Sequence, residues 1–177
     1  APDPRDVWQT PSGDLFAPFE NKPCKVAVCA ECPDHPTDPE VSAAIRQAAA
    51  MLKDAGYEVE EVEIPSITEA ADYWRDVLSN EMRQGLVGLM REHGDEMMNH
   101  MMDVQLDGLK EVDDAKGMLQ LIAKRSTLLR QWQLFFADYP ILLTAMTWIK
   151  PYADDLDIQE GLDIDWFFRA HGPMMGT

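Results

Sequence analysis

The chain is poor in basic residues, and this shortage argues against several classes of partner. Its 177 residues include 15 Lys and Arg against 32 Asp and Glu, which gives a formal charge of −17. Because nucleic-acid binding depends on Lys and Arg that neutralise phosphates, we expect no nucleic-acid partner. An anionic membrane surface would repel the chain for the same reason. The acidic residues are spread along the whole sequence, as on an ordinary solvated surface.

Long apolar runs are also missing. The longest, from Tyr139 to Met146, is far shorter than the ~20 residues that a membrane-spanning helix needs. The opening, Ala-Pro-Asp-Pro-Arg-Asp, has neither the basic start nor the apolar stretch of a signal peptide. We therefore expect no membrane partner and a cytoplasmic location. The Pro-rich opening without an initiator Met leads us to expect a section of a longer chain.

Cysteine is scarce. Cys24, Cys29 and Cys32 have the spacing C-x4-C-x2-C, which resembles part of a plant-type iron–sulfur motif, and His35 could add a zinc ligand. A fourth Cys is missing, however, and residues 25–28 have a strand pattern, on which Cys24 and Cys29 point to opposite faces. We therefore predict free thiols in a reducing compartment, no metal site and no cofactor.

No segment has the pattern of a complete catalytic site. The five serines are scattered, and none lies in a Gly-rich turn that would place its hydroxyl beside backbone N–H donors. The ten glycines occur singly, so no phosphate-binding loop is present. His93, Glu96 and His100 have the spacing of one helix face, but Gly94-Asp95 between them predicts a helix break. We therefore predict no catalytic residue in this chain.

Residues 1–23 differ from the rest of the chain. They contain five prolines and no hydrophobic periodicity, which predicts an extended Pro-rich connecting arm. Its apolar side chains suggest that the arm packs onto other protein: Trp8, Leu15, Phe16 and Phe19. Residues 24–177 then form the second predicted region, an α/β segment. The composition of the whole chain, 46% hydrophobic and 27% charged, is that of a globular protein.

The first part of this segment predicts a strand–helix–strand unit. Residues 24–29 are mostly apolar, and Asp38-Pro39 supplies an N-cap and a first-turn proline for a helix. Gly56 ends that helix in the left-handed conformation, and residues 58–64 are rich in β-forming side chains. Two strands joined in this way lie parallel. The apolar parity breaks within 58–64, which is typical of a bulge or a half-exposed edge.

The rest of the chain is mostly helical. Apolar stripes predict helices from Ile67 towards Met90, over 96–109, and from Asp113 or Asp114 to Pro140, the last of them buried over a wide arc. Residues 141–145 lack alternation, as a strand covered on both faces would, and an amphipathic stretch follows at 162–170. The predicted fold class is α/β, with a short, mostly parallel sheet of about three strands flanked by several helices.

These pieces, in this order, resemble the later half of amidase-signature enzymes. The resemblance is carried by Val26-Ala-Val28, Asp38-Pro-Glu-Val41, the stretch from Leu52 to Val62, Ala71-Asp-Tyr-Trp74, Arg130-Gln-Trp-Gln-Leu-Phe-Phe136 and Tyr139-Pro-Ile-Leu-Leu-Thr144. That family hydrolyses amide bonds with a serine nucleophile, a second serine and a lysine in a Gly/Ser-rich signature. The signature is absent here. The resemblance therefore implies an internal or C-terminal-half section of a larger amidase-signature-type fold, not competent alone.

The resemblance also implies what this section contributes. It would supply one flank of the sheet and a wall of the pocket for a small-molecule amide, with the remainder of the amidase chain as its partner. Ligands gather at the carboxyl ends of parallel strands, so we predict these substrate-pocket residues: Thr144, Met146, Thr147, Trp148 and Pro151. We expect them to be more exposed than their apolar character favours. We also expect Trp148→Ala to change acyl selectivity while leaving folding nearly intact.

Two other function classes remain open at this point. The run Met97-Met-Asn-His-Met-Met102 gathers flexible thioethers, which suit adaptable contact surfaces. The alternative hypothesis is therefore a stand-alone acidic protein-interaction module with a Met-rich contact surface. A metal-binding domain built on the three cysteines and His35 has the least support.

Overall fold

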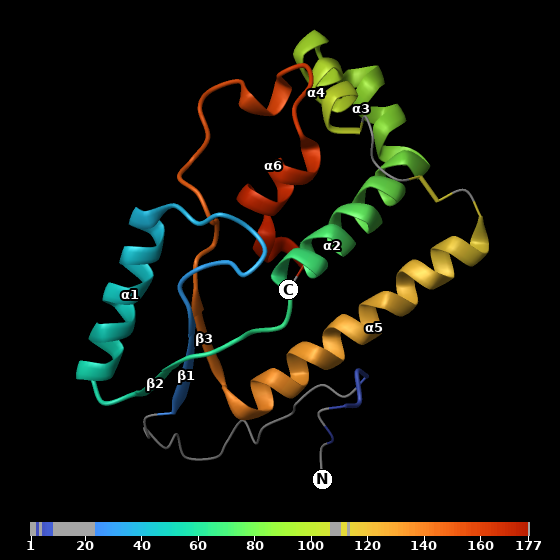
Figure 1. The fold of residues 1–177 in the computed structure, drawn as a ribbon. Coiled ribbons are helices and arrows are strands. Elements are labelled where there is room, and N and C mark those ends of the chain that lie inside the picture. Colours follow the sequence, from blue (N-terminus) through green and yellow to red (C-terminus); the bar gives the residue numbers. More distant parts are fainter. Residues whose placement is uncertain (1–2, 4, 9–23, 107–110, 113, 177) are drawn as a thin grey trace. The chain divides into compact units, whose positions relative to one another are not determined.

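The computed structural model describes residues 3, 5–8, 24–106, 111–112 and 114–176. The chain forms two compact units. The sheet unit comprises Ala1–Pro65 and Ser126–Ala145, and the helical unit comprises Ser66–Arg125 and Met146–Thr177. Figure 1 gives the elements of both units along the chain.

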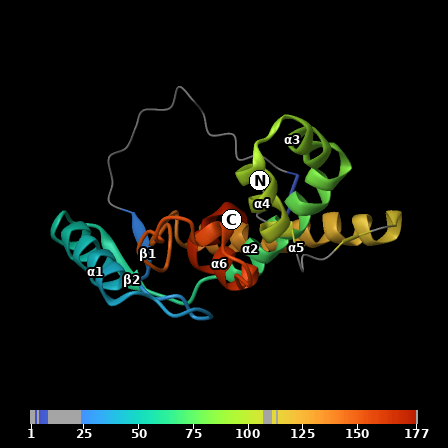
Figure 2. The ribbon, with the colours of Figure 1, turned by 90° about the horizontal axis from the view of Figure 1, so that it is seen from above.

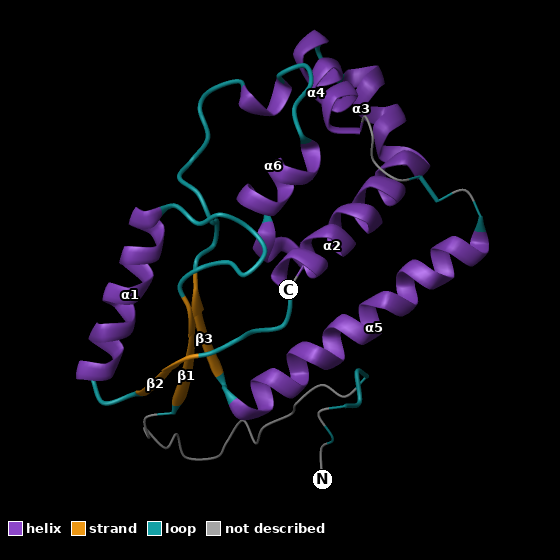
Figure 3. Ribbon diagram, in the orientation of Figure 1, coloured by secondary structure: helices purple, strands orange, loops and turns teal. Residues whose placement is uncertain are grey.

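The sheet unit contains a three-stranded parallel sheet with the order β2-β1-β3. Figure 3 shows its strands in orange, and they are β1 (Lys25–Cys29), β2 (Glu58–Glu61) and β3 (Ile141–Thr144). Val26 on the central strand is in register with Val59 on β2 and with Ile141 on β3. The predicted parallel pairing of the first two strands and the predicted number of strands are both confirmed.

The helix between the first two strands, α1 (Pro39–Asp54), begins and ends as predicted. The Asp38 carboxylate accepts a hydrogen bond of 2.8 Å from the Glu40 N–H, and Gly56 has a φ of 93°, which favours glycine. In Figures 1 and 2, α1 lies beside β1 and β2. β2 is an edge strand, which is one of the two alternatives that its broken parity suggested, and it ends earlier than predicted, at Glu61.

The expectation that residues 141–145 are buried is wrong for most of that stretch. β3 is the other edge strand, Ile141 is 40% exposed, and only Ala145, which follows the strand, is buried. An apolar run without alternation indicates that both faces of a strand suit apolar cover. It does not specify the position of the strand in the sheet, which depends on pairing with distant residues.

The long helix α5 (Ala115–Asp138) begins in the helical unit and continues into the sheet unit. The prediction that it is buried over a wide arc is wrong. Leu128 and Trp132 are its buried residues, whereas Ile122 is 56% exposed and Phe136 is also exposed. The two apolar stripes show which faces suit burial, but they do not determine what covers those faces.

The helical unit is built around α2 (Ile67–Glu81), which Ser66 caps through a 3.0 Å hydrogen bond from the Glu69 N–H. A π-helical turn, η1, continues α2 without a break. The further elements are η1 (Met82–Leu86), α3 (Val87–His93), α4 (Glu96–Leu106), the first part of α5, the 3₁₀ helix η2 (Leu156–Ile158), α6 (Ile164–His171) and the 3₁₀ helix η3 (Pro173–Gly176). The predicted break at Gly94-Asp95 is confirmed, because α3 ends at His93 and α4 begins at Glu96.

The core of the helical unit forms where α2 meets α6 and η3. Small residues allow this close approach, since Ala70 and Ala71 on α2 and Ala170 on α6 are all buried. Trp74 meets Phe168 edge to face, with ring centroids 6.2 Å apart. Across the described residues, no helix is long and apolar enough to cross a membrane.

Several predictions fall outside the described residues. These are most of the arm, with Leu15, Phe16 and Phe19, the end of the helix predicted over 96–109, and the start of the next helix at Asp113. Trp8 of the arm is described and is 87% exposed.

Candidate functional site

The five predicted pocket residues are divided between the two units. Thr144 ends β3 in the sheet unit, whereas the other four belong to the helical unit: Met146, Thr147, Trp148 and Pro151.

At the carboxyl edge of the sheet, the ends of β3 and β1 are tied together by Thr144. Its hydroxyl donates a hydrogen bond of 2.9 Å to the Cys29 carbonyl, and the Cys29 thiol donates to the Glu31 carbonyl over 3.2 Å. Burial raises the pKa of the Cys29 thiol. Because the thiolate is the nucleophilic form, Cys29 is a structural thiol here. The Thr144 hydroxyl positions the strand end, and its oxygen can still accept a hydrogen bond.

The loop after β1 borders an open depression of about 630 Å³. The side chains of Glu31, Ser42 and Arg46 at this depression are paired with one another. Arg46 donates to the Glu31 carboxylate over 2.7 Å and to the Ser42 hydroxyl over 2.6 Å. The hydrogen bond from Arg46 also lowers the pKa of the Glu31 carboxyl. The Arg46 guanidinium is therefore already neutralised, so the depression offers no strong anion site.

The residues weighed as metal ligands do not form a cluster. Cys24, Cys29 and Cys32 are free thiols. His93 and Glu96 lie on different helices, and the His100 ring nitrogen Nε2 is 2.8 Å from the Ile158 carbonyl. Within the described part of the chain, no three His, Cys, Asp or Glu side chains come together in a way that could hold a metal ion.

The loop after β3 combines exposed and buried residues. Met146 is 75% exposed and Pro151 is exposed, but Thr147 is half-buried, and its hydroxyl donates to the Ile149 carbonyl over 2.9 Å. Trp148 is fully buried, so the expectation that it would be accessible is wrong. Its backbone N–H donates to the Ala170 carbonyl of α6 over 3.1 Å, which ties the loop to the helical core. Aperiodic loop sequence gives no signal for such burial.

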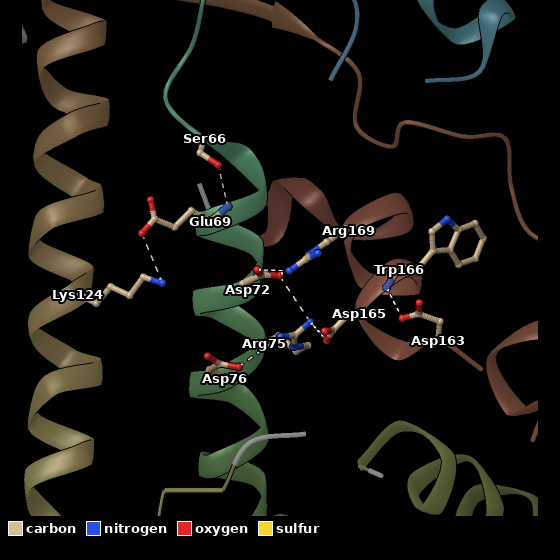
Figure 4. Close-up of polar contacts among 10 residues, drawn as sticks. All are labelled: Ser66, Glu69, Asp72, Arg75, Asp76, Lys124, Asp163, Asp165, Trp166 and Arg169. Atoms are coloured by element: carbon tan, nitrogen blue, oxygen red, sulfur yellow. Dashed lines mark hydrogen bonds and ion pairs between the residues drawn. The ribbon is translucent and has the colours of Figure 1, made fainter. Parts of the chain in front are cut away.

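An ion-pair cluster between α2 and α6, with the buried Arg75 at its centre, was missed by the sequence reasoning (Figure 4). Arg169 binds the Asp72 carboxylate with two hydrogen bonds of 2.9 and 2.7 Å. Arg75 lies 2.5 Å from Asp165 and within 3.6 Å of Asp72 and Asp76. The hydrogen bond to Asp72 raises the pKa of Arg169. The helical spacing of Asp72, Arg75 and Asp76 was the available signal for this cluster.

A second missed feature is an apolar cavity of about 220 Å³ inside the helical unit. Met101 and Met102 of the predicted Met-rich surface line this cavity, and Met102 is buried. Met97 and Met98 are exposed instead. The Met run is thus divided between a cavity wall and an open surface.

Comparisons of the sequence with known proteins identify relatives of this chain. The sequence matches the family model described as Amidase over residues 2–162. It is 37% identical over 149 residues to the indoleacetamide hydrolase of Bradyrhizobium diazoefficiens, which covers 82% of this chain and 27% of the relative. It is 38% identical over 153 residues to the indoleacetamide hydrolase of Bradyrhizobium japonicum, covering 84% of this chain and 31% of that relative.

The chain therefore spans 27% and 31% of the lengths of these two curated relatives. The family model, by contrast, extends over nearly the whole of the chain. A match of that extent, with which the three-stranded parallel sheet agrees, leads to one assignment. The chain belongs to the amidase family.

Proposed function

We propose that the chain is one section of an amide hydrolase whose catalytic serine, second serine and lysine lie outside these 177 residues. The observation that carries the proposal is the amidase match over residues 2–162, supported by the two relatives named indoleacetamide hydrolase. The reaction is acyl transfer: a serine hydroxyl attacks the amide carbonyl, the amine leaves, and water hydrolyses the acyl-enzyme.

The proposed substrate is a small primary amide of an aromatic acid. Both relatives are named for indoleacetamide, and hydrolysis of that amide releases indoleacetate and ammonia. Nothing in the comparisons favours the alternative of a stand-alone interaction module.

The chain's own contribution to the proposed enzyme is one flank of the sheet and part of the pocket wall. Met146 and Pro151 are exposed, which suits direct contact with a substrate. Trp148 is buried and bonded to α6, so its role is to position the loop. The hydroxyl groups of Thr144 and Thr147 donate hydrogen bonds to backbone carbonyls. Towards a ligand, these hydroxyls can therefore act only as acceptors.

Ammonia release from indole-3-acetamide tests the proposal. We expect turnover by the complete protein that contains this chain, with inhibition by a serine-directed reagent, and no turnover by the 177 residues alone. Absence of activity of the complete protein on any simple amide would remove the proposed function. Robust hydrolysis by the 177 residues, blocked by the serine reagent, would place the nucleophile inside the chain.

The role of the loop is tested by Met146→Ala in the complete enzyme. We expect a change in the relative kcat/KM for amides of different acyl size, because a large exposed contact is removed. Met97→Ala is the matched control, since Met97 is an exposed methionine on α4, outside the loop. An unaltered substrate profile in well-folded Met146→Ala would exclude this part of the loop from the pocket.

A further inference from the structure

The apolar cavity of the helical unit has the construction of a ligand site. It lies between α2, α4 and α6 and has a volume of about 220 Å³. Its apolar wall is formed by Trp74, Leu78, Met82, Met101, Met102 and Phe168. Aromatic rings offer flat faces, and methionines adapt their shape to what they contact, so the wall suits a planar apolar group.

The size of the cavity limits what it can hold. Apolar cavities of about 150 Å³ stay dry and bind a benzene-sized molecule. The present cavity is larger, at about 220 Å³. It therefore has room for one aromatic ring and a short substituent, but not for a peptide or a lipid chain.

Gln105 adds a polar group to the wall of the cavity, beside the guanidinium of Arg75. It lines the cavity, is half-buried, and its carboxamide forms no hydrogen bond with any described residue. A carboxamide can both donate and accept a hydrogen bond. A ligand that fills the apolar space and presents one carbonyl group would therefore find a donor at the wall.

The charges around the cavity favour an uncharged ligand. Arg75 also lines the cavity and is only 9% exposed, but three carboxylates pair with it: Asp72, Asp76 and Asp165. Arg169 is the second guanidinium of this cluster. Three carboxylates thus face two guanidiniums, as Figure 4 shows, so the ion pairs leave no net positive charge at this wall to attract an anion.

One wall of the cavity is formed by an irregular helical turn. Met82 is the first residue of η1, and such π-helical turns occur frequently at functional sites. Arg83 of the same turn donates to the carbonyl of Leu106, a lining residue at the end of α4, over 2.9 Å. The irregular turn and the end of α4 are therefore joined at the cavity.

We propose that this cavity binds a small, uncharged aromatic molecule that carries one carbonyl group. The proposal goes beyond amide hydrolysis and does not rest on it, because the cavity binds the ring whether or not the ligand is cleaved. Acetophenone is a suitable probe, since it has the ring and the carbonyl but no amide bond. Benzoate is the matched anionic probe, with a ring of the same size.

Binding is measured by NMR of the protein labelled at its methionine methyl groups. We expect acetophenone to shift the Met82, Met101 and Met102 signals saturably, while the exposed Met97 and Met98 signals stay unchanged. Benzoate should bind at least about tenfold more weakly. Unshifted cavity methyl groups would overturn the site, as would equal shifts of all five signals. Equally tight benzoate binding would overturn the assignment of an uncharged ligand.

Two variants locate the contacts. Leu78→Trp fills the cavity and should abolish the acetophenone shifts. Gln105→Leu removes the polar group and should weaken acetophenone binding about fivefold to tenfold. The matched control is Gln84→Leu, an exposed glutamine on η1 that does not line the cavity, and it should bind as the wild type does. Wild-type affinity in Gln105→Leu would show that Gln105 does not contact the ligand. If Leu78→Trp does not fold, the methionine shifts of the wild-type protein alone decide whether the cavity binds acetophenone.

Discussion

The sheet unit and the helical unit bury their side chains in different ways. The sheet unit concentrates burial on its central strand, where the four residues from Val26 to Cys29 are buried and the neighbouring strands are at most half-buried. The helical unit distributes burial over α2, α4, α6 and the loop at Trp148, and it includes a buried arginine with its carboxylate partners. The buried side chains of the sheet unit are mostly apolar and gather on one strand. Those of the helical unit come from several elements and include an ion-paired arginine.

This difference explains why the sheet unit is easier to predict from the sequence than the helical unit. A central strand is recognised from its continuous apolar sequence, and the helix that follows it is recognised from its capping residues. Both patterns lie within a short stretch of the chain. A dispersed core is assembled from segments far apart in the chain, and no segment carries the whole pattern. The sheet unit should therefore lose most stability through β1 and through the buried Leu128 and Trp132 of α5. The helical unit should lose most through its few large buried side chains.

The largest effect is expected from Trp148→Ala, because the burial of this side chain overturns the expectation that the substitution leaves folding nearly intact. Trp148 is among the largest fully buried side chains, and removing it should cost about 3–5 kcal/mol of unfolding free energy. Urea unfolding of the purified variant measures this loss. Trp166→Ala is the control within the same unit, because Trp166 is 39% exposed and should cost much less. Similar losses in both variants would mean that burial at position 148 does not stabilise the helical unit.

Val26→Ala tests the sheet unit in the same way. Val26 is fully buried on β1, and losing two methyl groups from a packed strand should cost about 2 kcal/mol. Its partner in register, Val59 on the edge strand, is half-buried, so Val59→Ala should cost about 1 kcal/mol or less. The two variants remove the same atoms, so equal losses in urea unfolding would contradict the concentration of the core on β1.

The same contrast explains which parts could be predicted from the sequence. The first two strands, α1, its Asp38 cap and the Gly56 turn were predictable, because each depends on a local preference. The edge position of β3 was not, because strand order is set by pairing between β1 and residues more than a hundred positions away. The exposed faces of α5 were not predictable either, since periodicity identifies an apolar face but not its cover.

The candidate site followed the same rule. The position of the loop after β3 at a strand end was predictable from topology. The burial of Trp148 depends on its bond to α6, and the cavity depends on α2, α4 and α6 meeting, so neither has a local signal. Only part of the ion-pair cluster could be predicted from the sequence. The Asp72–Arg75 pair has a helical spacing, but Arg169 comes from a distant segment.

A smaller effect that should be equal in the two units comes from the helix caps. Asp38 caps α1 in the sheet unit and Ser66 caps α2 in the helical unit, each accepting a backbone hydrogen bond. Asp38→Ala and Ser66→Ala should each cost about 1 kcal/mol in thermal or urea unfolding. Asp38→Asn and Ser66→Thr keep an acceptor and should cost less. A loss several times larger for one alanine variant would show that its cap supports tertiary contacts beyond the helix end.

The smallest effect is expected at the exposed edge of the sheet, where Tyr139 donates a 2.6 Å hydrogen bond to the Glu60 carboxylate. This bond, with the nearby Lys25 ammonium, lowers the pKa of Glu60. A lowered pKa stabilises the fold above the ordinary glutamate pKa, and that stabilisation is lost as the pH falls through the lowered value. Because solvent still reaches this half-buried pair, its contribution to stability should be far below that of any buried contact in either unit. Tyr139→Phe should raise the pKa of Glu60 towards its ordinary value, leaving the part due to Lys25, and carboxyl-carbon NMR titration measures the change. An unchanged Glu60 pKa in Tyr139→Phe would show that Lys25, and not the tyrosine, holds this carboxylate ionised.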